Sequence, residues 1–83
     1  MYELLYSERA KKFLKKLDKD SQKRIISSIE RCRIRPYHFV SKIVASKYFR
    51  LRAGDYRVIL KIEDGELTIL IIKIGHRRNV YKG

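Results

Sequence analysis

The sequence predicts an α+β fold in which a helical hairpin packs on a mainly antiparallel sheet of about four strands. Two patterns lead to this class. Apolar residues recur at helical spacing in the first part of the chain and alternate with a period of two in the second part. Because 83 residues provide for one core, we expect a single domain covering residues 1–83.

One strand and two helices are expected first. Residues 1–6 are rich in Tyr and Leu, which favours a strand, and Ser7 is a suitable N-cap for the first helix. Residues 18–20 break the apolar pattern and offer caps for the second helix. Pro36 disfavours helical geometry in the residue before it, so the second helix should end near Ile34. The apolar positions of the two helices are Ala10, Phe13, Leu14, Leu17, Ile25, Ile26, Ile29 and Cys32.

Residues 35–45 are less regular, but they are too apolar for a free linker. We expect an ordered crossing segment that packs on the core.

Three strands in a meander should follow. From Ser46 the pattern has a period of two, and 53–55 read as a turn. The Asp64-Gly65 pair between two apolar runs is typical of a hairpin. Residues 67–74 are apolar on both faces, as in a central strand, and the first strand should join the sheet at one edge.

The alternation also separates two faces of the sheet. Tyr56, Val58, Leu60 and Ile62 share one face, whereas Arg57, Ile59 and Lys61 share the other. We therefore expect Tyr56 to pack in the core and Arg57 to point outward.

The net charge is +12, from 21 Lys and Arg against 9 Asp and Glu, which favours a polyanionic partner. Cys32 is the only cysteine and lies on an apolar helix face, so we expect a buried structural thiol and no intramolecular disulfide. This composition agrees with a cytoplasmic setting. The first residues lack the apolar stretch of a signal peptide, and no apolar run is long enough to span a membrane.

Candidate functional side chains gather on the sheet and the C-terminal tail. The acidic residues are dispersed, so no metal site is expected, and no glycine-rich phosphate loop is present. Arg and Tyr on one sheet face suit phosphate binding and base stacking, or metal-free cleavage of RNA by its own 2′-OH group. Composition alone does not separate cleavage from simple binding. These side chains are Tyr48, Arg50, Arg52, Arg57, Lys61, His76, Arg77, Arg78 and Tyr81.

Two stretches of the sequence resemble the RelE/ParE family of toxins. Residues 48–59, Tyr-Phe-Arg-Leu-Arg-Ala-Gly-Asp-Tyr-Arg-Val-Ile, resemble its Arg-rich strand, glycine turn and Tyr-Arg pair. Residues 72–81, Ile-Lys-Ile-Gly-His-Arg-Arg-Asn-Val-Tyr, look like its closing motif of a strand, glycine, basic residues and a Val-Tyr pair. The basic helices of the first half fit the same family, so the resemblance covers the whole chain.

The resemblance implies a toxin that cleaves mRNA in the ribosomal A site and inhibits translation until an acidic, RelB-like antitoxin silences it. It implies no metal and no small-molecule cofactor. By motif, Arg57 and Arg77 would stabilise the phosphate and the transition state, with further charge from Arg50 and Lys47. Tyr81 and His76 compete for the proton-transfer role, because His76 stands where a basic residue is common. The residues expected to bind RNA or the ribosome are Lys12, Lys16, Lys47, Tyr48, Arg52, Lys61 and Arg78.

Two other functions remain open. The same fold serves ParE-like toxins that bind DNA gyrase and perform no RNA chemistry. A non-catalytic member that binds nucleic acid or an antitoxin is the third possibility.

Overall fold

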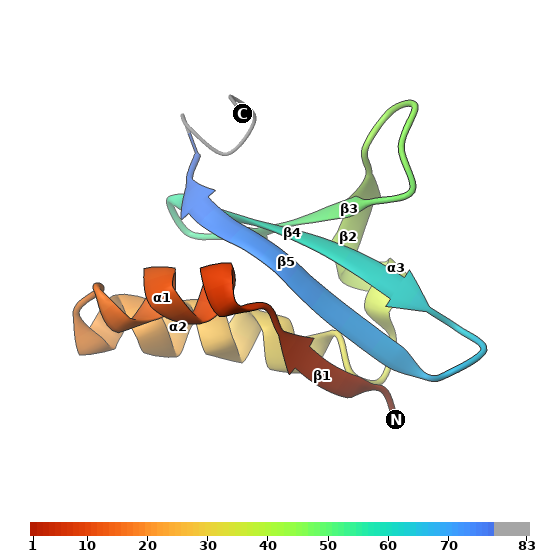
Figure 1. The fold of residues 1–83 in the computed structure, drawn as a ribbon, viewed down its shortest axis with the longest axis horizontal. Helices are drawn as coiled ribbons and strands as arrows, with labels where there is room; N and C mark the ends of the chain where they lie inside the picture. Colours follow the sequence, from red (N-terminus) through yellow and green to blue (C-terminus); the bar gives the residue numbers. More distant parts are fainter. Residues whose placement is uncertain (78–83) are drawn as a thin grey trace.

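In the part of the chain that the structure describes, five strands form one sheet, and the two long helices pack on one of its faces (Figure 1). The structure is a computed structural model, and it describes residues 1–77. The strand order is β1-β5-β4-β3-β2, with β1 parallel to β5 and every other neighbouring pair antiparallel. In chain order the elements are β1 (Glu3–Tyr6), α1 (Glu8–Lys15), α2 (Lys19–Arg31), α3 (Pro36–Phe39), β2 (Val40–Lys42), β3 (Phe49–Ala53), β4 (Tyr56–Glu63) and β5 (Thr68–His76).

Both long helices begin at the caps expected from the sequence. The Ser7 hydroxyl accepts the Ala10 N–H at 3.0 Å, and Asp18 Oδ2 accepts the Ser21 N–H at 3.1 Å. Helix α2 ends at Arg31, three residues before the expected end. The cause is long-range, because the Arg33 carbonyl accepts the Tyr2 N–H at 2.7 Å and so pairs with the N-terminal segment.

The core lies between the two helices and the sheet. It confirms the alternation expected for β4, since Val58 and Leu60 are fully buried. Cys32 is also fully buried, and burial raises the pKa of its thiol to about 11, so the thiol is structural as expected. The hydrophobic core cluster consists of Ala10, Ile25, Ile29, Cys32, Leu51, Ala53, Val58, Leu60, Ile69, Ile71 and Ile74. Within residues 1–77, no helix is long and apolar enough to cross a membrane.

The expectation of about four strands was one strand short. Residues 35–45 contain the short helix α3 and the edge strand β2. Strand β2 has three residues and pairs only with β3, Ser41 lying opposite Arg50. Three residues are too few for a period of two to appear in the sequence.

The two turns of the meander use left-handed residues at different places. Gly54 has φ of 61°, a left-handed conformation that favours glycine, and a Cβ atom there would displace the Arg24 side chain, 2.9 Å from its Cδ. The hairpin expected at Asp64-Gly65 is present. Its left-handed residue, however, is Leu67, with φ of 49°.

A β-bulge interrupts the pairing of β4 with β5. Ile59 lies opposite Lys73 and Leu60 opposite Ile71, which leaves Ile72 as an extra residue. The extra residue reverses the alternation of β5. Ile71 faces the core before the bulge and Ile74 after it.

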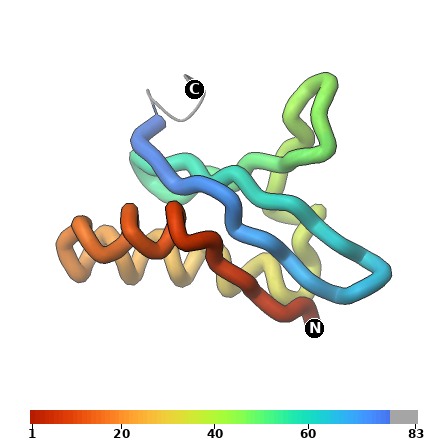
Figure 2. Tube along the Cα trace, viewed as in Figure 1, coloured from red at the N-terminus to blue at the C-terminus, as the bar shows by residue number. Residues whose placement is uncertain are grey.

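Asp64, in the turn between β4 and β5, connects the N-terminal segment to α3. Figure 2 shows the N-terminus close to this turn. Its two carboxylate oxygens accept hydrogen bonds from the Tyr2 hydroxyl at 2.6 Å and the Tyr37 hydroxyl at 2.7 Å. These hydrogen bonds lower the pKa of Asp64 below its ordinary value of 3.8. The same carboxylate raises the pKa of Tyr37 from 10.0 to about 12.

Tyr37→Phe should therefore lower the urea midpoint only while Asp64 is ionised and Tyr37 is neutral. Because the folded state lowers the pKa of Asp64, its contribution is present above pH 3.8 and disappears as the pH falls through the lowered value. Because the folded state raises the pKa of Tyr37, that contribution is present below pH 10 and disappears as the pH approaches 12. Urea unfolding of both proteins from pH 2 to 12 measures this window. Tyr48→Phe is the control, and a gap between wild type and Tyr37→Phe that does not change with pH would contradict the prediction.

Candidate functional site

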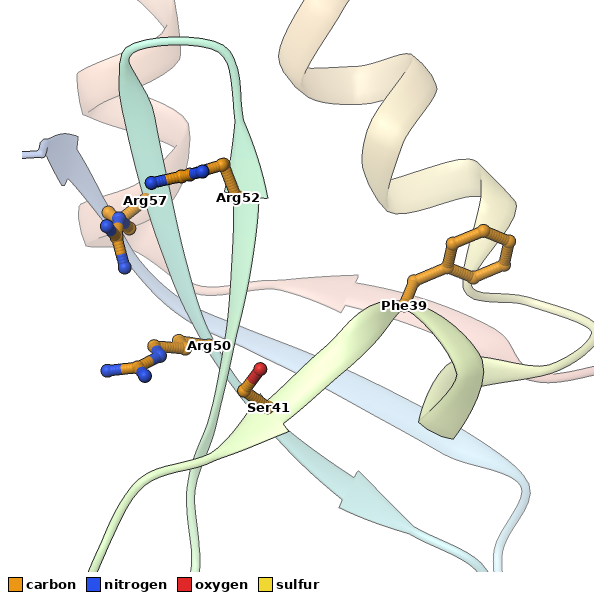
Figure 3. A pocket seen from close by; sticks show the side chains of 5 residues that line it. All are labelled: Phe39, Ser41, Arg50, Arg52 and Arg57. Atoms are coloured by element: carbon orange, nitrogen blue, oxygen red, sulfur yellow. The ribbon is translucent and has the colours of Figure 1, made fainter.

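The sheet face opposite α1 and α2, here called the outer face, carries a pocket of about 310 Å³ at β2, β3 and β4. Figure 3 shows three arginine side chains projecting from this face, with Arg52 extending across the strand pair toward Arg57. The Ser41 hydroxyl points toward the arginines, whereas the Phe39 ring turns away. The residues that line this arginine pocket are Phe39, Ser41, Arg50, Arg52 and Arg57.

The strand register explains why the arginines meet. Arg52 on β3 lies directly opposite Arg57 on β4, and Arg50 projects from the same face of β3 two residues earlier. Side chains directly opposite in an antiparallel pair have Cβ atoms about 5 Å apart, and two like charges there destabilise the sheet. Among residues 1–77, no carboxylate forms an ion pair with Arg52. An anion bound between the two strands would relieve this repulsion.

Arg77 continues the arginine face beyond the end of β5. Gly75 lies opposite Arg57, and the Arg77 N–H donates to the Asp55 carbonyl at 2.9 Å. This bond extends the antiparallel pairing by one step, so that position 77 follows position 75 on the side of Arg57. The hydrogen bond thus places the backbone of Arg77 beside the end of β4 that carries Arg57, while the pocket itself is lined by Arg50, Arg52 and Arg57.

His76 lies on the other face of the sheet. It is paired with Tyr56, the residue that faces the helices, and its ring lies 4.8 Å from the Tyr56 ring and 6.4 Å from the Phe13 ring. The expectation that His76 shares a site with Arg57 is therefore not met. The bulge at Ile72 is the cause, because without the extra residue position 76 would have faced outward.

The other candidate cations are dispersed. Lys61 forms an ion pair with Glu63 at 2.7 Å, which raises its pKa, and it lies at the opposite end of β4 from Arg57. Lys47 Nζ lies 5.8 Å from the ring centroid of Tyr48, and both belong to the loop that projects between β2 and β3 in Figure 1. Lys12 and Lys16 are exposed on the helical layer, away from the arginine pocket. Arg78 and Tyr81 lie outside the residues that the structure describes.

Sequence reasoning missed two residues of the outer face. Ser41 enters the pocket from β2, the strand that the sequence did not reveal. Lys73 lies opposite Ile59 and is half-buried. The bulge therefore places Lys73 on the outer face and His76 on the helix side. The apolar residues Phe39 and Val40, which precede Ser41, are compatible with a strand. No pattern in the sequence predicts the bulge at Ile72.

This arrangement suits the recognition of phosphate. Each guanidinium presents a planar fork of N–H donors that matches two phosphate oxygens, and a hydroxyl accepts or donates one further hydrogen bond. Arginine retains its charge throughout the physiological range, so the pocket contributes electrostatic stabilisation and not proton transfer. A base or an acid for cleavage has to come from a residue outside this pocket.

Comparisons with known proteins agree on one family. The sequence model described as "ParE toxin of type II toxin-antitoxin system, parDE" matches residues 4–81. The chain is 35% identical to Toxin RelG of Mycobacterium tuberculosis over 34 residues. That match covers 41% of this chain and only 39% of RelG.

Solved structures give the same fold over nearly the whole chain. The toxin in the archaeal RelE-RelB complex from Pyrococcus horikoshii superimposes with a TM-score of 0.81 at 26% identity, covering 95% of this chain and 98% of that one. The intact E. coli RelBE toxin-antitoxin complex gives a TM-score of 0.78 at 21% identity, covering 92% and 96%. At that lower identity the likeness concerns the fold alone. Because the family model matches residues 4–81 and a RelE structure superimposes on nearly the whole chain, the chain belongs to the RelE/ParE family of toxins from type II toxin–antitoxin systems.

Proposed function

We propose that this toxin cleaves mRNA in the A site of the translating ribosome. The observation that carries the proposal is the arginine pocket, where Arg52 and Arg57 face each other across two strands and Arg50 lies beside them. Three guanidinium groups that line one pocket on one sheet face suit the binding of a polyanion such as RNA. A net charge of +12 favours a highly charged target such as ribosome-bound RNA.

The proposed reaction uses the 2′-OH of the RNA as the nucleophile. The 2′-oxygen bonds to the adjacent phosphorus and the bond to the 5′-oxygen of the next nucleotide breaks, which leaves a cyclic phosphate and a 5′-hydroxyl. Arg57 and Arg52 hold the non-bridging oxygens, where negative charge accumulates in the transition state, and Arg77 adds charge from the same face. Arg50 and Ser41 position the neighbouring phosphate. Tyr81 remains the candidate for proton transfer, and the scheme needs no metal or organic cofactor.

An acidic, RelB-like antitoxin is the proposed second partner. Structures similar to this chain include RelE-RelB complexes from Pyrococcus horikoshii and Methanococcus jannaschii. The positive charge of the chain complements an acidic protein. Because the proposed target is the translating ribosome, we expect the toxin to act in the cytoplasm.

Purified toxin added to a reconstituted translation reaction should cut the mRNA at codon positions. Primer extension maps the 5′ ends of the fragments. Omitting the ribosomes should abolish cleavage, because the ribosome orients the mRNA in the A site. Intact mRNA in the complete reaction would exclude the proposed function.

A second candidate is inhibition of DNA gyrase, favoured by the match to the ParE model of the family. This reading predicts intact mRNA together with trapped gyrase–DNA cleavage complexes. Incubation of the toxin with gyrase and supercoiled plasmid, followed by detergent and protease, detects such complexes as linear DNA. The two assays together separate the two targets.

A further inference from the structure

We propose that His76 is a positioning residue, which holds Arg77 on the arginine face by stacking on Tyr56 and not by transferring a proton. The inference rests on the proposed function for its activity readout. Its structural part concerns how the end of β5 is held in place.

Three rings meet where β4, β5 and α1 come together. The Tyr56 and His76 rings lie 4.8 Å apart with an interplanar angle of 37°. Phe13 of α1 presents an edge to both, at 6.1 Å from Tyr56 and 6.4 Å from His76. These separations lie in the range of favourable aromatic pairs. The cluster therefore attaches the last residue of β5 to the helical layer.

The same register that forms this cluster keeps His76 away from the reacting phosphate. Tyr56 is paired with His76, and Arg57 with Gly75. Successive side chains of a strand point to opposite faces, so His76 and Arg57 lie on opposite sides of the sheet. The His76 ring therefore lies on the helix side of the sheet, next to Tyr56 and Phe13, and the arginine pocket lies on the other side.

His76 instead influences the position of Arg77, the next residue in the chain. The Arg77 N–H bonds to the Asp55 carbonyl at 2.9 Å, one step beyond the last residue pair of the ladder. A terminal hydrogen bond of this kind opens readily unless the adjacent residue is packed. The contact between the tilted His76 and Tyr56 rings supplies that packing and so holds the backbone of Arg77 in place.

The test compares His76→Ala with His76→Phe, which keeps a flat ring but has no titratable nitrogen. Single-turnover cleavage of mRNA at saturating ribosome concentration should be about tenfold slower for His76→Ala, because small misplacements of a charged group are costly to rate. The ribosome concentration that gives half the maximal rate should change little. His76→Phe should stay within about twofold of wild type, since an aromatic ring at that position restores the contact. His38→Ala, at an exposed histidine whose ring pairs with Phe39, is the matched control.

A second readout does not depend on RNA. Hydrogen exchange of the Arg77 amide, followed by NMR, should be faster in His76→Ala and protected in wild type and His76→Phe. Urea unfolding of each variant confirms that only the end of β5 is affected.

Two results would overturn the inference. His76→Phe as slow as His76→Ala, with the Arg77 amide still protected, would identify His76 as a chemical group. Normal exchange in His76→Ala would show that the ring does not hold the strand end. If wild type fails to cut mRNA, the proposed function is lost, whereas the exchange measurement still decides the positioning role.

Discussion

Arg57→Ala should slow mRNA cleavage about a hundredfold to a thousandfold without unfolding the toxin. Arg57 is half-buried near the start of β4, opposite Arg52 and beside Gly75. Removing one such donor to a developing negative charge typically costs two to three orders of magnitude in rate. The rate constant for single-turnover cleavage on programmed ribosomes measures the loss.

The stability of the same variant distinguishes a working arginine from a structural one. Alanine removes the packing of the arginine stem, which destabilises the sheet, but it also removes the repulsion from Arg52. We expect the two effects to offset each other, so that the unfolding free energy changes by less than about 1 kcal/mol. A structural arginine would show the reverse pattern, with stability lost and activity falling only in proportion.

Arg57→Lys and Arg31→Ala complete the comparison. Lysine keeps the charge but lacks the planar fork, so Arg57→Lys should recover part of the rate. Arg31 is exposed in the last turn of α2, away from the arginine pocket, and Arg31→Ala should cleave at the wild-type rate. If Arg57→Ala cleaves mRNA at the wild-type rate, the arginine pocket is not the active site.

Much of the fold could be predicted because its signals are local. Ser7 and Asp18 cap their helices through side-chain bonds to a residue three positions later, and such spacing is visible in the sequence. Strand β4 has eight residues, long enough for alternation to separate Val58 from Arg57. Strand β2 has three, and its pairing with β3 depends on a loop whose geometry the sequence does not state.

The candidate site was predictable only as far as alternation is unbroken. Arg50, Arg52 and Arg57 lie on strands whose pairing has no irregularity between them, and the structure brings them into one pocket. On β5 a single extra residue, Ile72, reverses the faces. His76 thereby moves to the helix side and Lys73 to the outer face. A one-residue shift has this effect because the side-chain period is two.

Ile71→Ala should have the largest effect on stability, costing about 3 kcal/mol of unfolding free energy. Ile71 is fully buried and lies between Tyr6 of β1 and Leu60 of β4, so its side chain contacts the centre of the core. The loss comprises the transfer free energy of three carbon groups and the cavity that they leave. A domain of this size has a total stability of about 4 to 12 kcal/mol, so the variant would retain only part of its margin.

Urea unfolding of three variants tests whether burial is responsible. Ile71→Val removes one methylene and should cost about 1 kcal/mol. Val44→Ala, at a loop position that is 90% exposed, should change the unfolding free energy by less than about 0.5 kcal/mol. Equal costs for Ile71→Ala and Val44→Ala would contradict the core assignment.

Ile71 directly precedes the bulged residue Ile72, so its side chain also anchors the point where β5 changes faces. Ile71→Ala should therefore speed hydrogen exchange of the Lys73 amide more than that of the Ile25 amide in α2.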